Sequence, residues 1–144
     1  MALSITIEFI PVRLGRHPFP YGDSNKPHIN LDDLAASNPI YGGERFVNDD
    51  RAGCTIIYGY NSKLPPVNDK DRGHFHPDNA ESWVILQGLM RYKIEGQEVF
   101  IASEGDVVYV PKFTFHLARW WGDGPSCRLS MHGYPQNLAH LRDP

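Results

Sequence analysis

Two histidines separated by one residue, His74 and His76, are the strongest chemical signal in the chain. In an extended segment, residues i and i+2 point to the same side, so both imidazoles can bind one metal ion. A turn over residues 77–80 follows, and Glu81 then opens the next predicted strand, so its carboxylate can fold back toward the two imidazoles. A histidine pair also occurs by chance on surface strands, and on the pair alone that alternative stays open.

The residues around this pair resemble the first sequence motif of the cupin superfamily. That motif contains two histidines, a glutamate and a closing glycine. Here four residues separate His76 from Glu81, and six separate Glu81 from Gly88. The motif begins with glycine in the family, whereas this chain has Asn68 at that position.

A second stretch resembles the other cupin motif. Five residues separate Gly105 from Pro111, and His116 follows where the motif has its histidine. Two positions depart from the family pattern: Phe113 replaces a glycine and Trp120 replaces an asparagine. Because the departures fall on turn and pocket positions, they affect the expected shape of the pocket more than the expected ligands.

The resemblance implies an all-β fold, a single-domain double-stranded β-helix or jelly-roll barrel of two antiparallel sheets. It also implies that four side chains converge inside the barrel on one divalent transition metal. Three imidazoles and one carboxylate suit Fe(II), which we favour, as well as Mn, Ni, Co or Zn. Four ligands on a six-coordinate ion leave two positions for a substrate, or for substrate and O₂. The alternative is a cupin that keeps the four only as a polar core. The implied metal ligands are His74, His76, Glu81 and His116.

Aromatic residues accompany the predicted ligands. A period of two places one tryptophan on the ligand face of each ligand-bearing strand, and a strand over residues 54–60 carries two tyrosines on one face. If these faces point inward, the rings form a wall suited to a small, flat organic substrate. The alternative is that the rings only fill the barrel. The expected substrate-binding residues are Tyr58, Tyr60, Trp83 and Trp120.

The last predicted strand, Cys127–His132, is ambiguous because its two faces differ. The apolar face, with Cys127, Leu129 and Met131, is the expected core face. If the polar face points inward instead, His132 becomes an acid or base candidate and Arg128 a clamp for a carboxylate. Arg91 is a further catalytic candidate.

The elements that must position these residues are short strands. The chain has 144 residues, enough for one domain, and its 13 glycines and 12 prolines mark many turns. We expect residues 1–50 to form an N-terminal strand, an arm and a short helix, and residues 52–135 to form the barrel core. The predicted helix is Leu31–Ser37, capped by Asn30; the predicted strands are Ser4–Val12, Cys54–Tyr60, Glu81–Gln87, Leu89–Ile94, Glu98–Ala102, Val107–Val110, Phe115–Trp120 and Cys127–His132.

Charge and composition narrow the partners. The net charge is −3 with no basic cluster, which argues against nucleic acid and anionic membranes. No apolar run approaches the length of a membrane span and no signal peptide is evident, so we expect a cytoplasmic protein with both cysteines reduced. The apolar N-terminal strand and the proline-rich arm at residues 17–27 favour a homodimer, since free edge strands tend to be covered.

Three functions fit these observations. The favoured one is a metal-dependent enzyme that acts on a small organic substrate, suited to aromatic ones, in a dioxygenase-type reaction. The second is a non-redox lyase, decarboxylase or isomerase that uses the metal as a Lewis acid. The third is a non-catalytic cupin that binds a small molecule, because fold does not determine function.

Overall fold

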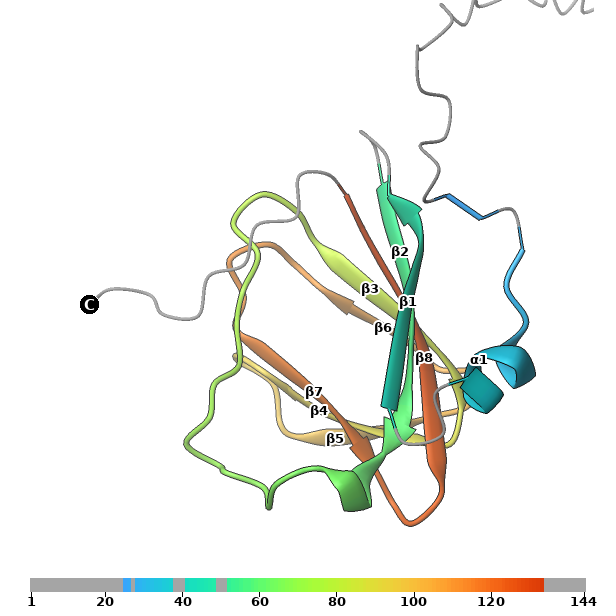
Figure 1. Cartoon of the computed structure of the whole chain (residues 1–144). Helices are drawn as coiled ribbons and strands as arrows, with labels where there is room; N and C mark the ends of the chain where they lie inside the picture. The colour runs from blue at the N-terminus through green and yellow to red at the C-terminus, as the bar shows by residue number, and fades with distance from the viewer. Residues whose placement is uncertain (1–24, 27, 38–40, 49–51, 134–144) are drawn as a thin grey trace, which may run out of the picture.

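The computed structural model describes residues 25–26, 28–37, 41–48 and 52–133. These residues form one short α-helix, eight strands and one turn of 3₁₀ helix (Figure 1). Their bounds are α1 Leu31–Ser37, β1 Tyr41–Asn48, β2 Ala52–Tyr60, η1 Asn61–Lys63, β3 Glu81–Gln87, β4 Leu89–Ile94, β5 Phe100–Ser103, β6 Val107–Val110, β7 His116–Trp121 and β8 Pro125–Gly133.

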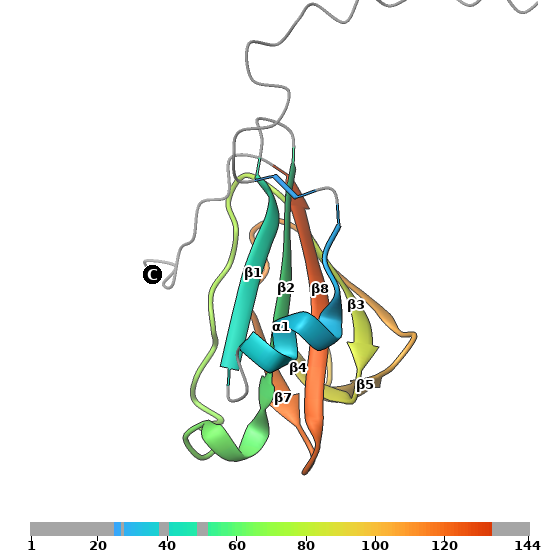
Figure 2. The same ribbon diagram turned by 45° about the vertical axis from the view of Figure 1, so that its right-hand side comes forward.

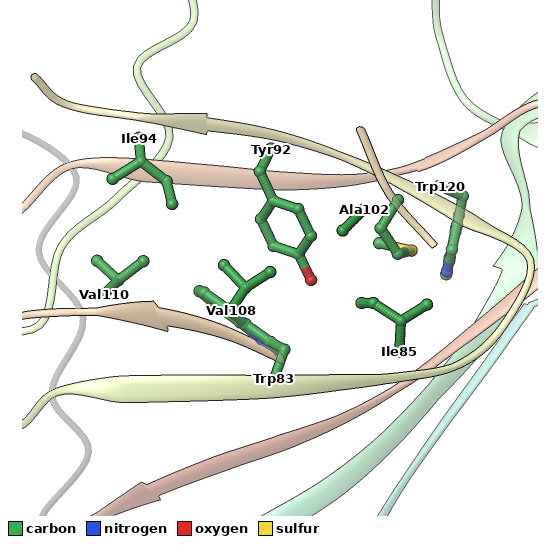
Figure 3. Packing of buried hydrophobic residues seen from close by; sticks show 9 residues of the cluster. Trp83, Ile85, Tyr92, Ile94, Ala102, Val108, Val110 and Trp120 are labelled. Carbon is green, nitrogen blue, oxygen red and sulfur yellow. The ribbon is translucent and has the colours of Figure 1, made fainter. Parts of the chain in front are cut away.

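The strands form two antiparallel sheets that face each other. One sheet has five strands in the order β1-β2-β8-β3-β6, and the other has three in the order β5-β4-β7. The main core lies between them and takes side chains from both sheets, including Trp83 and Ile85 of β3 and Tyr92 of β4 (Figure 3). This arrangement is the jelly-roll barrel that the sequence predicted, so the fold class is confirmed.

Helix α1 covers the outer face of the larger sheet (Figure 2). Its N-cap is the Asn30 side chain, whose Oδ1 accepts hydrogen bonds from the backbone N–H groups of Asp32 at 2.9 Å and Asp33 at 3.1 Å. Leu34 packs against Ile56 and other side chains of the sheet in a second buried cluster. The described helices include none with the length and apolar character needed to cross a membrane.

Most predicted elements match the structure closely. The helix and the strands at 81–87, 89–94 and 107–110 have the predicted bounds, and the ends of the other predicted barrel strands shift by at most two residues. Strand β1 was not predicted, because its sequence, Tyr-Gly-Gly-Glu-Arg-Phe-Val-Asn, lacks regular alternation. It is nevertheless held by backbone pairing with β2, from Tyr41 opposite Gly59 to Asn48 opposite Gly53. The predicted strand Ser4–Val12 and the arm as far as residue 24 lie outside the described residues.

Candidate metal centre

Four potential metal ligands converge at one end of the barrel. They are His74, His76, Glu81 and His116, and one ligand atom from each lies within 4.8 Å of all the others. His74 is half-buried, whereas the other three are buried. All four residues that the sequence singled out for metal binding belong to this cluster.

The backbone of the loop before β3 places the first two histidines. His74 forms an isolated bridge with His116 through two hydrogen bonds, 3.1 Å from the His74 N–H and 2.8 Å from the His116 N–H. Phe75 points away from the ligands and packs on Phe115, with ring centroids 5.0 Å apart. His74 and His76 therefore share one side, as their spacing predicted, although they lie beside β7 without forming a regular strand.

The loop that carries His116 holds a strained residue. Phe113 has φ of 61°, a left-handed conformation that costs a residue with a Cβ about 1–2 kcal/mol. Its N–H donates a 2.8 Å hydrogen bond to the carbonyl of His76, so this conformation ties the second motif to the first. The family pattern has glycine at this position, and the structure shows that the backbone keeps a glycine-type conformation although the residue is phenylalanine.

Glu81 is held as a carboxylate by its neighbours. Its Oε2 lies 2.9 Å from His76 Nε2 and 3.4 Å from His116 Nε2, and the Ser130 hydroxyl donates a hydrogen bond to Oε1. Burial alone would raise the pKa of Glu81, but the adjacent His116 and His76 side chains and the hydrogen bond from Ser130 outweigh burial and lower the pKa well below its ordinary value. The carboxylate is therefore a negatively charged donor for a cation.

The tautomer of His116 is set by the backbone. Its Nδ1 lies 2.9 Å from the carbonyl oxygen of Thr114, which can only accept, so Nδ1 carries the proton. Nε2 then has a free lone pair, faces Glu81, is buried and has no hydrogen-bond partner among residues that the structure describes. A buried acceptor beside a carboxylate and two more imidazoles fits a divalent transition metal, and a hydrogen bond from the distal nitrogen is the usual support of a histidine ligand.

The polar face of β8 points into the barrel, and this corrects the expectation that the apolar face does. The register places Ser130 opposite Trp83 and His132 opposite Glu81, and directly opposed residues project to the same side. The apolar face of β8 is also buried, because Cys127 and Leu129 pack in the second cluster beneath α1. The sequence does not show that α1 packs on the outer face of this strand. The prediction was wrong because it assumed that only the inner face of β8 would be buried and therefore apolar.

His132 and Arg128 therefore both lie on the inner face of β8. His132 is 8% exposed, and its Nδ1 lies 2.8 Å from the carbonyl of Gly133. Its ring occupies the space that glycine leaves at position 53, since a Cβ there would lie 2.4 Å from Nε2. The structure thus brings His132 next to the metal ligands and Arg128 deeper into the barrel, opposite Ile85.

The aromatic candidates divide into two groups. Trp83 and Trp120 belong to the barrel core, and the Trp83 ring centroid lies 5.3 Å from that of His116. Tyr58 and Tyr60 are not brought to the centre, because their face of β2 packs in the second cluster beneath α1. Arg91 also points away, forming an ion pair with Asp69 at 3.4 Å.

Two residues that support the interior were not predicted as site residues. Ser130 bonds Glu81, and Tyr92 of β4 is fully buried beside Trp83 with ring centroids 5.3 Å apart. The alternation of buried Met90, Tyr92 and Ile94 along β4 could have identified the inward position of Tyr92. No sequence signal marked Ser130 as the partner of Glu81, because that contact joins residues 49 positions apart.

Comparison with known proteins agrees with this description. Residues 62–132 match the sequence model of the cupin domain, and a search of curated protein sequences found no match. A double-stranded β-helix protein from Klebsiella pneumoniae superposes with a TM-score of 0.63 at 15% identity, covering 85% of this chain and 98% of that one.

Two other solved structures show the same fold. An RmlC-like cupin family protein from Methanocaldococcus jannaschii has a TM-score of 0.56 at 18% identity, with 74% of this chain and 86% of that chain covered. The DMSP lyase DddQ from Ruegeria pomeroyi has a TM-score of 0.51 at 19% identity, with coverages of 78% and 58%. With both motifs, the two facing sheets and the four convergent side chains in place, the chain belongs to the cupin superfamily.

Proposed function

We propose that this protein is a metal-dependent enzyme that acts on a small organic substrate in a dioxygenase-type reaction. The observation that supports it is the convergence of three imidazoles and one carboxylate, with ligand atoms within 4.8 Å of one another and three of the four residues buried. A divalent transition metal, Fe(II) by preference, would supply coordination positions beyond those four ligands for substrate and O₂.

The chain's own residues prepare the site in three ways. Ser130 and His76 keep Glu81 in its anionic form, and the Thr114 carbonyl holds the proton of His116 at Nδ1. Trp83 packs against His116 and keeps bulk water from the interior side of the ligands, where its side chain is 2% exposed. His132 lies beside the ligands on the opposite strand and is the candidate to hold or accept a proton during turnover.

The first experiment is elemental analysis of protein purified without a metal-chelating column. We expect close to one equivalent of a divalent transition metal in the wild type and a large loss in His76→Ala. His28→Ala is the matched control, because His28 is exposed and far from the cluster in sequence. Equal metal content in wild type and His76→Ala would remove the proposed site.

The second experiment tests the reaction class. Iron-loaded protein should consume O₂ with catechol-, dihydroxy- or diketone-type compounds, and His76→Ala should not. Absence of O₂ uptake across such a panel, with metal bound, would exclude the dioxygenase-type reaction.

A non-redox lyase is the second candidate, and one comparison favours it. The DMSP lyase from Ruegeria pomeroyi, at 19% identity, has the same fold, so a protein of this fold carries out a lyase reaction. Turnover that needs a metal but not O₂ would support a lyase, decarboxylase or isomerase.

Ligand-induced stabilisation without turnover would support a non-catalytic binding protein. We also place the protein in the cytoplasm, where its two cysteines, Cys54 and Cys127, would stay reduced.

A further inference from the structure

The hydroxyl of Tyr92 is buried in the barrel without a hydrogen-bond partner. The residue is 0% exposed, and its oxygen contacts no donor or acceptor within hydrogen-bonding geometry in the described part of the chain. Figure 3 shows the hydroxyl leaving its own sheet and pointing toward the side chains of Trp83 and Ile85 on the facing sheet. Buried hydroxyls are nearly always bonded, so this one indicates a partner that the polypeptide does not supply.

The hydroxyl lies one inward-facing position below the metal ligands. On β4, Ile94 pairs with His116 and Tyr92 pairs with Ala118, two residues further along β7. Trp83 connects the two levels, because its ring centroid is 5.3 Å from that of His116 and 5.3 Å from that of Tyr92. The Tyr92 ring is therefore linked to His116 through a single side chain, that of Trp83.

The surroundings keep this hydroxyl protonated and place a guanidinium charge near it. Burial raises the pKa of Tyr92 far above its ordinary value, and the negative charge of Glu81 raises it further, so the group keeps its proton. The charge of Arg128, which lies on the inner face of β8, acts on the same hydroxyl in the opposite direction and favours negative charge there. A protonated donor near a guanidinium favours an anionic oxygen as its acceptor.

We propose that Tyr92 binds a carboxylate of the substrate, so that the substrate is a small organic acid whose other end reaches the metal ligands. This inference rests on the proposed function only in placing the reacting end of the substrate at the four ligands. Tyr92 is then a specificity-determining residue, and its hydroxyl selects an acid over the neutral analogue that lacks the carboxylate.

A binding experiment with two matched probes tests the inference. The probes are 3,4-dihydroxybenzoate and catechol, which share a metal-chelating end and differ only in the carboxylate. Affinities are measured by titration with full-length, zinc-loaded protein, because zinc has no redox chemistry and allows binding without turnover. We expect the wild type to bind the acid about 10- to 100-fold more tightly than catechol, as for a charge-assisted hydrogen bond.

Tyr92→Phe removes only the hydroxyl and should abolish this preference while leaving catechol affinity unchanged. Tyr109→Phe is the matched control, since Tyr109 is 61% exposed on β6, and should keep the wild-type preference. Equal affinity for the two probes in the wild type, or an undiminished preference in Tyr92→Phe, would overturn the inference. If the hydroxyl only holds a water molecule, the preference will not depend on it, which is the same overturning result.

Nuclear magnetic resonance of the zinc-loaded wild type gives a second reading that needs no variant. The buried hydroxyl proton of Tyr92 should move downfield when 3,4-dihydroxybenzoate binds and stay in place with catechol. An unchanged resonance at saturating acid would contradict the proposal even if Tyr92→Phe failed to fold. If the proton moves but iron-loaded protein consumes no O₂, the dioxygenase assignment fails and the carboxylate site stands.

Discussion

Ser130 is one of the residues that keep Glu81 charged, and it is not itself a candidate metal ligand. It is 3% exposed and donates its hydroxyl to Glu81 Oε1, on the side of the carboxylate that His76 does not bond. Hydrogen bonds of this kind orient a ligand and stabilise its charged form, and their loss commonly lowers metal affinity by about 10- to 100-fold. The role of Ser130 can be separated from its packing because a second buried serine lies on the same strand.

We expect Ser130→Ala to lower metal affinity by about 10- to 100-fold. Ser126→Ala should affect stability alone, because Ser126 bonds the backbone of Leu89 at 2.7 and 3.3 Å and contacts none of the four ligands. Its loss should cost about 1–3 kcal/mol of unfolding free energy and leave metal affinity unchanged. Competition with a chromophoric chelator and urea denaturation measure the two quantities. Equal metal affinity in both variants would contradict the role assigned to Ser130.

Cys127 gives a prediction about alkaline pH. Burial raises the pKa of its thiol to about 11, and Arg128 opposes this only in part. The native thiol therefore stays protonated while the unfolded thiol, with a pKa of about 8.5, ionises. The stabilisation is fully present below the unfolded value and is lost as pH rises toward the folded value.

Between about pH 9 and 11, this single thiol should lower the unfolding free energy by up to about 1.4 kcal/mol per pH unit. Urea denaturation of the wild type and of Cys127→Ala at pH 8.5 and 10 should show a steeper loss in the wild type. Cys54→Ala retains the buried thiol and should behave like the wild type. Parallel pH dependence in wild type and Cys127→Ala would show that the thiol is not held neutral.

At the scale of elements, the metal centre depends on how closely the loop before β3 approaches β7. Gly73 has φ of +74°, and a Cβ at this position would lie 2.0 Å from the carbonyl oxygen of His116. That carbonyl accepts the hydrogen bond from the N–H of His74. A side chain at position 73 would therefore force apart the two segments that carry ligands.

Gly73→Ala should weaken metal binding by more than tenfold and destabilise the fold by several kcal/mol. Gly105→Ala is a control for the backbone alone, since Gly105 has φ of +89° and a Cβ there would meet nothing within 4 Å. It should cost about 1–2 kcal/mol and leave metal binding intact. Metal titration of both variants decides the point, and intact binding in Gly73→Ala would mean that the loop can shift without moving His74.

At the scale of the whole molecule, the larger sheet ends at β1 on one side and β6 on the other. Val107 and Tyr109 of β6 are 68% and 61% exposed. Edge strands with exposed apolar side chains tend to be covered in soluble proteins. Together with the apolar segment at residues 4–12, this supports our proposal of a homodimer.

Size-exclusion chromatography with light scattering should give about twice the chain mass of 16.3 kDa. A variant that lacks residues 1–24 should be monomeric if the N-terminal segment contributes to the dimer. A monodisperse species at the mass of one chain, at micromolar concentrations and above, would remove the proposal.

The sequence by itself predicted the short strands and, through its resemblance to the cupin motifs, the barrel and the four candidate ligands. Short alternating strands follow from local periodicity, and motif spacing places His76 and Glu81 across one turn and His116 at the start of its strand. Both signals are local in sequence, so they can be recognised without knowing which segments pack against each other in the fold. The N-cap at Asn30 was predicted for the same reason.

Tertiary structure alone decided which faces point inward. Tyr58 and Cys127 pack beneath α1, and the polar residues Arg128, Ser130 and His132 face the interior, because both sides of the larger sheet are covered. A period of two identifies the two faces of a strand but cannot say which one meets the barrel when each has a buried partner. The partners of Glu81 and the position of the Tyr92 hydroxyl likewise depend on contacts between strands distant in sequence, which no local pattern encodes.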